Sequence, residues 1–377
     1  MTWLILTFLS HLVFIPGLYD GFSLPKRVYA FGLGIAAIVY LISQHRKLPL
    51  FGLILSYLGF SLIPLFWLAN LPLFIERFGL DVACFAVFWA VAISDLDKEK
   101  IKTVLAFASV VAALVLAAEH FLPVTHGTMG NQKYTAFVAA QAAPLMLALL
   151  PGIAPILAVW TLTILSLPSR AAFSAAGISL FIFGVCRRVR WIGLAFCLAM
   201  IVAMTFPAFV KGFNLDVDRR AVWLNSASML GSTRTLFFGI GRGQFDVEYP
   251  AYANRIETDD GTGEYMVTLS DVNITKGLGA GFVGAASRTQ SHPHNEFINS
   301  FIESGLFAGV VFWWVLLSLI DGIWFSKDSA TLAIICSLIV TVLFSTFWFP
   351  FTHPSMAITF WALAGLLWNH SSRSGVI

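Results

Sequence analysis

Charged side chains are scarce in this sequence of 377 residues. They make up 11% of it, whereas 58% of the residues are hydrophobic. A soluble protein of this length needs far more charge to cover its surface, so the composition excludes an ordinary soluble domain. The formal net charge of +3 is also too small to indicate a nucleic-acid partner.

Cysteine and clustered acidic residues are also rare. The four cysteines all lie within apolar segments: Cys84, Cys186, Cys197 and Cys336. A thiol packs there as a small hydrophobic group, so neither a disulfide framework nor a cysteine metal site is expected. The pair Asp216 and Asp218 could bind a divalent ion, but a helix cap also explains Asp218. We therefore expect no metal and no cofactor.

Long apolar runs fill most of the chain instead. Runs of about 15 to 20 residues recur almost from end to end, which predicts an all-α, polytopic membrane protein with about twelve transmembrane helices. The expected spans are 3–18, 28–43, 49–69, 79–94, 101–119, 135–150, 153–168, 171–186, 190–210, 297–325, 329–349 and 354–369.

Lysine and arginine indicate which connections face the cytoplasm, because positive loops tend to stay there. The strongest cluster is Arg187-Arg188-Val189-Arg190, which places the next connection on the outer face. Both termini then lie in the cytoplasm. The expected organisation is N-terminal spans in 1–210, a large outer loop in 211–296 and C-terminal spans in 297–377.

The outer loop, about 85 residues long, is polar but retains aromatic side chains, which favours a folded cap over a flexible linker. Residues 218–230 predict an amphipathic helix that begins at Asp218. The glycines at 239, 241 and 243 predict a tight turn whose backbone amides a ligand could approach.

Several cations are expected on the outer side. Arg170 begins a span, Arg219 and Arg220 open the loop helix, Arg242 lies in the glycine turn, and Lys133 lies in another outer loop. Guanidinium groups bind phosphate with paired hydrogen bonds and stay charged. Each residue also has an ordinary explanation, as an interfacial anchor, a solvated helix face or a turn residue.

A histidine closes the outer loop. His294 stands where the polar segment ends and an apolar helix begins, in Ser291-His292-Pro293-His294-Asn295. Histidine titrates near neutral pH and can take a proton from a hydroxyl. A residue that merely starts the helix is an equally good explanation of His294. With the arginines, His294 indicates chemistry on a lipid-linked phosphate or pyrophosphate.

The motifs in 168–315 resemble those of the O-antigen ligase and O-antigen polymerase superfamily. In chain order they are Ser169-Arg170-Ala171, Arg220-x-x-Trp223, Phe238-Gly239-Ile240-Gly241-x-Gly243-x-Phe245, and His294-Asn295-x-x-Ile298 followed by Glu303, Gly305 and Gly309. The chain departs from the family pattern at Ala308, where glycine is common, and at Ile298, where leucine is usual. Neither position bears on the chemistry.

The resemblance implies a metal-independent glycosyltransferase of the bacterial inner membrane, with its active site on the periplasmic face. The donor would be polysaccharide on undecaprenyl pyrophosphate. In a ligase the acceptor is a sugar hydroxyl of lipid A-core, and in a polymerase it is another lipid-linked repeat. The compact length and single long loop favour the ligase. A protein O-oligosaccharyltransferase and a transporter of lipid-linked sugar are weaker alternatives.

On this hypothesis His294 is the general base for the acceptor hydroxyl. Arg170 and a loop arginine, first Arg242 and then Arg220, would hold the pyrophosphate and stabilise its leaving charge. Arg219 and Lys133 are further candidates for pyrophosphate binding. Asn295 and Glu303 would support the helix start that follows the histidine.

Overall fold

The computed structural model describes most of the chain. The described residues are 1–15, 22–121, 129, 131–149, 169–186, 217–252, 293, 295–320 and 328–373. Within these ranges the chain forms helices and no strand, which confirms the all-α prediction. The expected spans 153–168 and 190–210, and the candidate base His294, lie outside the described residues.

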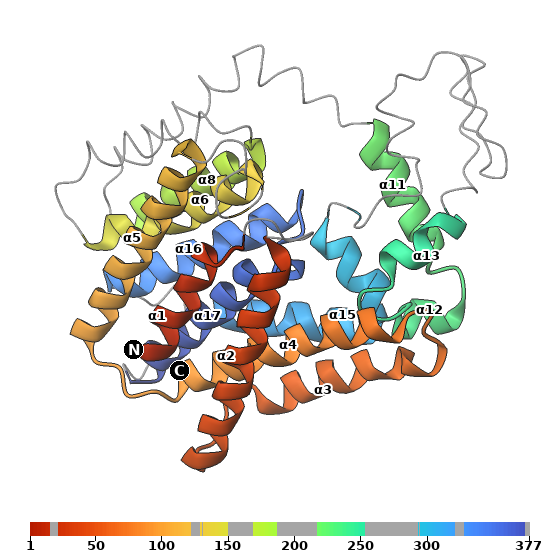
Figure 1. Ribbon diagram of the computed structural model, residues 1–377, viewed down its shortest axis with the longest axis horizontal. Helices are drawn as coiled ribbons and strands as arrows, with labels where there is room; N and C mark the ends of the chain where they lie inside the picture. Colours follow the sequence, from red (N-terminus) through yellow and green to blue (C-terminus); the bar gives the residue numbers. More distant parts are fainter. Residues whose placement is uncertain are drawn as a thin grey trace. The chain divides into compact units, whose positions relative to one another are not determined.

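The N-terminal helices are α1 (Thr2–Leu9), α2 (Ser23–Gln44), α3 (Phe51–Leu62), α4 (Leu71–Ala92), α5 (Lys98–Phe121), α6 (Gln132–Leu149) and α8 (Arg170–Cys186), with 3-10 turns η1 (Ser10–Leu12) and η2 (Ile63–Trp67) (Figure 1). The later helices are α11 (Val217–Ser228), α12 (Thr233–Phe238), α13 (Phe245–Tyr252), α15 (Glu296–Ile320), α16 (Ser329–Ser345) and α17 (Pro354–Arg373), with the 3-10 turn η5 (Pro350–Thr352) before α17.

Each predicted span that falls in the described ranges coincides with helix, but some ends differ. Helix α4 begins at Leu71 and not at residue 79. Its first turn is capped by Asn70, whose Oδ1 accepts the backbone N–H of Leu73 at 3.2 Å. The charged pair Glu76 and Arg77 interrupts the apolar run in the sequence, so hydropathy alone starts this helix too late.

Among the described residues, three helices are long and apolar enough to cross a membrane, by length and composition: Ser23–Gln44, Glu99–Ala118 and Glu296–Leu319. Along α2 the apolar side chains of Val28, Ile35, Val39 and Ile42 are exposed. A continuous apolar face of this kind is unfavourable in water and favourable against lipid. These features are those of a membrane protein.

The chain divides into two compact units. Unit 1 comprises Met1–Phe51, Gly79–Ala203 and Leu316–Ile377, and unit 2 comprises Gly52–Phe78 and Met204–Val315. The boundaries expected at 210 and 296 separate membrane spans from an outer loop, and they stay a prediction. The loop helices pack with α3, the first turns of α4 and most of α15, so loop and helices form one unit.

Unit 1 is a helix bundle. Helix α6 packs against α5, α8 and α16, while α17 packs against α1, α2 and α16. Polar side chains join α6 to α16 inside this apolar bundle: Gln141 Nε2 donates to Thr341 Oγ1 at 3.0 Å, and Ser337 Oγ donates to the Gln141 carbonyl at 2.7 Å. Such bonds between small and polar residues are a usual way to fix helix pairs in an apolar environment.

Unit 2 combines α3, η2 and the start of α4 with α11, α12 and α13, drawn in shades of green in Figure 1, and with most of α15. Helix α3 contacts α15 through two ring pairs, Tyr57 with Phe312 and Phe60 with Phe307, each with centroids 5.5 Å apart. The predicted helix at 218–230 is present as α11.

Candidate functional site

The glycine turn at 239–243 connects α12 to α13 and lies against α15. The amide of Ile240 donates to the Ile302 carbonyl, and that of Gly241 donates to the Glu303 carbonyl, both at 2.9 Å. These carbonyls accept from the turn because α15 is broken just beyond them, at Gly305. The break leaves helical carbonyls without their usual partners, and the turn supplies the missing donors.

The break itself depends on a close backbone approach. Gly239 and Gly305 have φ values of 78° and 74°, in the left-handed region. A Cβ on Gly239 would lie 2.5 Å from the Glu303 carbonyl oxygen, and a Cβ on Gly305 would meet the backbone of residues 237–239. The sequence predicted a tight turn here, and the structure confirms it. The close approach is to the protein's own α15.

The other side of the turn is held by the segment before α4. Gln244 is fully buried, and its side chain accepts from the Asn70 amide and donates to the Asn70 carbonyl, both at 2.7 Å. The indole of Trp67 donates to the Gly239 carbonyl at 3.4 Å. The turn is therefore fixed between α15 and the segment before α4. The amides of residues 239, 240 and 241 bond to protein carbonyls, so these three are not a ligand cradle.

Arg242 forms a buried ion pair with Glu303. Its Nη1 lies 2.9 Å from Glu303 Oε2, and the two side chains are 5% and 2% exposed. Burying either charge alone would be very unfavourable, so each requires the other. Glu303 lies about two turns into α15. The pair joins the glycine turn to α15 by a side-chain contact as well as by backbone bonds.

The residues on either side of His294 in the sequence are well held. The indole N–H of Trp223, in α11, donates to the Pro293 carbonyl at 2.8 Å. Asn295 caps α15, because its Oδ1 accepts the amide of Ile298 at 3.1 Å. Two motifs about 70 residues apart are thus joined by a direct hydrogen bond.

The other predicted cations fall in both units. Arg219 and Arg220 lie in the first turn of α11 in unit 2, and Arg170 is the first residue of α8 in unit 1; their side chains are outside the described part of the structure. Lys133, also in unit 1, places its ammonium group 4.5 Å from the ring centre of Trp348. Such a cation–π contact is an ordinary interaction between a lysine and an aromatic side chain.

A small hydrophobic core holds these parts of unit 2 together. It consists of Val222, Met229, Ile240, Phe245, Tyr249 and Ile302, from α11, the turn, α13 and α15. Burying one such side chain contributes about 1.5–3 kcal/mol. Burial raises the pKa of Tyr249, although its hydroxyl accepts a hydrogen bond from Asn225 Nδ2 at 3.2 Å.

One face of α15 carries buried polar side chains that the sequence analysis did not single out together. Glu296, Asn299 and Glu303 follow one another at helical spacing and are 1%, 0% and 2% exposed. Asn299 Nδ2 donates to Glu296 Oε1 at 3.4 Å. The signal was present in the sequence as polar residues at i, i+3 and i+7 in an apolar helix. Gln244, also missed, had no comparable pattern.

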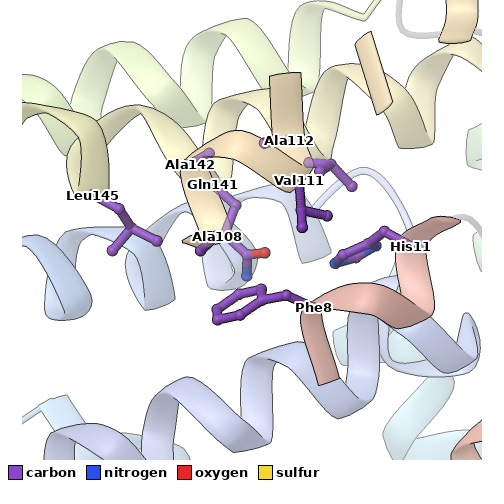
Figure 2. Close-up of a pocket in the computed structure, with 9 residues that line it drawn as sticks. Phe8, His11, Ala108, Val111, Ala112, Gln141, Ala142 and Leu145 are labelled. Carbon is purple, nitrogen blue, oxygen red and sulfur yellow. The ribbon is translucent and has the colours of Figure 1, made fainter. Parts of the chain in front are cut away.

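Unit 1 contains a small cavity lined by residues of α1, η1, α5 and α6 (Figure 2). Its polar lining residues are His11, which lies 3.0 Å from Thr359 Oγ1, and Gln141. The free volume is about that of one water molecule, which is far too small for a sugar. None of the predicted site residues lines it.

A scan against protein-family models gives no match to this chain, and a search of curated proteins gives none either. The resemblance to the O-antigen ligase superfamily therefore depends on the motifs alone. The motif Ser169-Arg170-Ala171 belongs to unit 1, and the other three motifs belong to unit 2, where their arrangement is the basis for a proposed function.

Proposed function

We propose that this protein is a membrane glycosyltransferase of the O-antigen ligase kind. It would transfer polysaccharide from undecaprenyl pyrophosphate to a sugar hydroxyl of lipid A-core. The proposal includes about twelve spans in the bacterial inner membrane, cytoplasmic termini and a periplasmic loop at 211–296. If the acceptor is another lipid-linked repeat, the same chemistry makes the protein a polymerase.

The hydrogen bond between Trp223 and Pro293 is the observation that supports this proposal best. Trp223 follows Arg219 and Arg220 by about one turn of α11. Pro293 precedes His294 directly in the chain. A phosphate-binding helix start and the residues next to a candidate base are therefore connected by one short contact, as transfer from a pyrophosphate would require.

The proposed reaction has one bond formed and one broken. The acceptor hydroxyl gives its proton to His294 and attacks the anomeric carbon of the donor sugar. The bond from that carbon to the pyrophosphate oxygen breaks, and undecaprenyl pyrophosphate leaves with the bonding electron pair. The guanidinium groups of Arg219 and Arg220 stabilise the charge that develops on the leaving oxygen.

The buried ion pair changes the part we assign to Arg242. Because its guanidinium contacts Glu303, we assign Arg242 to hold the glycine turn on α15 and favour Arg220 as the loop arginine at the pyrophosphate. Arg170 and Lys133 belong to unit 1, and their participation is inferred from the sequence only.

The test is complementation with His294→Ala in a strain that lacks the native gene, with lipopolysaccharide resolved on a gel. We expect capped lipopolysaccharide to disappear while long lipid-linked polymer accumulates. His292→Ala is the matched control, two residues away and outside the motif, and it should behave like the parent. Membrane levels of both variants must equal those of the parent.

Other outcomes have definite meanings. Lipopolysaccharide that carries single repeats and no long polysaccharide would identify a polymerase. Parental behaviour of His294→Ala would show that another group takes the proton. Trp223→Phe keeps the ring but removes the indole donor, so we expect transfer to fall about tenfold, the equivalent of one hydrogen bond, at unchanged membrane level.

A further inference from the structure

Unit 2 exposes an apolar patch to which three elements contribute. The 3-10 turn η2 provides Leu65 and Phe66, α12 provides Leu236, and α15 provides Leu306 and Phe307. Phe66 is 87% exposed, so very little of its ring is packed against the protein. Exposed apolar side chains of this size are unfavourable in water when they gather on one surface, and they mark a surface that another phase or molecule covers.

Contacts between the three elements make the patch one surface. Phe307 of α15 stacks on Phe237 of α12, with ring centroids 5.2 Å apart. The indole of Trp67, which follows Phe66, donates to the carbonyl of Gly239 directly after α12. The elements η2, α12 and α15 therefore present their exposed apolar side chains from one packed assembly.

The patch continues along the helix that is apolar enough to span a membrane. Phe307, Val310 and Trp314 stand at i, i+3 and i+7 in α15, so they share one face of the helix, and all three are exposed. They lie within Glu296–Leu319, which has the length and composition of a membrane span. The exposed face of such a helix is favourable against acyl chains. Lipid is therefore the occupant that fits a patch continuous with this face.

A cation stands at the edge of the patch. Arg234 in α12 is exposed, and its guanidinium carbon lies 5.0 Å from the ring centre of Trp67. No carboxylate in the described part of the chain forms an ion pair with Arg234. Tryptophan and arginine favour the boundary between acyl chains and headgroups, because each combines an apolar body with a polar end. The charge at this edge complements the phosphate of a lipid headgroup.

We propose that η2 and α12 form an interfacial anchor in the headgroup region of the bilayer. Phe66 and Leu236 enter the bilayer by about 5–10 Å, as the apolar face of an interfacial helix does. The guanidinium of Arg234 binds a lipid phosphate. Part of the segment predicted as an outer loop is then in contact with lipid, and the adjoining glycine turn is kept close to the membrane surface. The anchor goes beyond the proposed function and does not depend on the transferase chemistry.

Depth in the bilayer is the first test. Phe66→Cys and Leu236→Cys are made singly in the full chain after the native cysteines are replaced, and each is spin-labelled in vesicles of phosphatidylethanolamine and phosphatidylglycerol. We expect both labels to collide with oxygen, which dissolves among acyl chains, and to lose nearly all collisions with a water-soluble nickel complex. The matched control is Ala227→Cys, at an exposed position of α11 in the same unit, and its label should keep the nickel collisions. Nickel access at positions 66 and 236 equal to that at 227 would overturn the anchor.

Melting temperatures in detergent test the phosphate contact. Added phosphatidylglycerol should raise the melting temperature of the parent by about 2 °C more than that of Arg234→Gln, because a ligand of the folded state stabilises it. Inorganic phosphate at the same concentration should raise neither. Equal shifts of the two proteins with phosphatidylglycerol would overturn the headgroup contact. A shift of the parent with inorganic phosphate as large as that with the lipid would overturn it too, since it would show that Arg234 binds a free anion.

Discussion

At the scale of single residues, Arg242 and Glu303 show how burial changes the meaning of a charge. In the sequence Arg242 is a cation in a glycine-rich polar loop, which is a common setting for phosphate binding. In the structure it is 4% exposed and its guanidinium contacts a carboxylate 61 positions along the chain. The ion pair joins the glycine turn to α15, which backbone hydrogen bonds also connect. Its main effect is therefore to hold the turn in place on the helix.

We predict that Glu303→Gln lowers the free energy of unfolding by about 3–5 kcal/mol, because it removes the carboxylate that pairs with the buried Arg242 guanidinium. Thermal or denaturant unfolding in detergent measures this change. The double variant Arg242→Leu with Glu303→Leu should recover most of the stability, since an apolar pair replaces an ionic one. We expect transfer activity to recover with it. A double variant that is stable but inactive would show that Arg242 is needed for transfer itself, as a pyrophosphate-binding residue.

At the scale of elements, α15 is the helix on which unit 2 depends. The sequence predicts one span from 297 to 325, but the helix is broken at Gly305. Before the break the helix buries Glu296, Asn299 and Glu303; after it, Val310 and Trp314 expose apolar side chains. The two parts therefore suit different surroundings, one a polar protein interior and the other lipid.

We predict that Gly305→Ala strongly destabilises the protein. The alanine must adopt a left-handed φ, which costs about 1–3 kcal/mol, and its Cβ collides with the backbone next to Gly239. The control is Gly59→Ala in α3, where a Cβ meets no atom within 4 Å and alanine should favour the helix by about 0.5–1 kcal/mol. Melting temperatures should move in opposite directions. A neutral Gly305→Ala would show that the turn and α15 are not in contact.

At the scale of the whole molecule, the position of the outer loop relative to the membrane is the central prediction. We test it with single cysteines at two exposed positions, Thr233 in α12 and Glu99 in α5, after the native cysteines are replaced. A membrane-impermeant maleimide should label Thr233→Cys in spheroplasts and Glu99→Cys only after lysis. The opposite pattern would invert the topology and place the site in the cytoplasm.

Much of the fold could be predicted from the sequence because it depends on local patterns. The apolar runs predicted helices at nearly every described position, and the loop helix at 218–230 and the glycine turn followed from capping and turn residues. The sequence did not predict contacts between residues that are far apart in the chain. The reciprocal bonds between Gln244 and Asn70 join residues 174 positions apart and have no local signal.

The sequence by itself determined the helical, membrane-protein character, since long apolar runs with few charges can satisfy their backbone within lipid as helices. The sequence also indicated His294 and the arginines as candidates for the proposed transfer reaction. Only the tertiary structure decided which residues meet: Trp223 with Pro293, Arg242 with Glu303, and Gly239 with Gly305. Each contact joins segments about 60–70 residues apart, and such contacts arise from burial and close packing that local sequence does not encode.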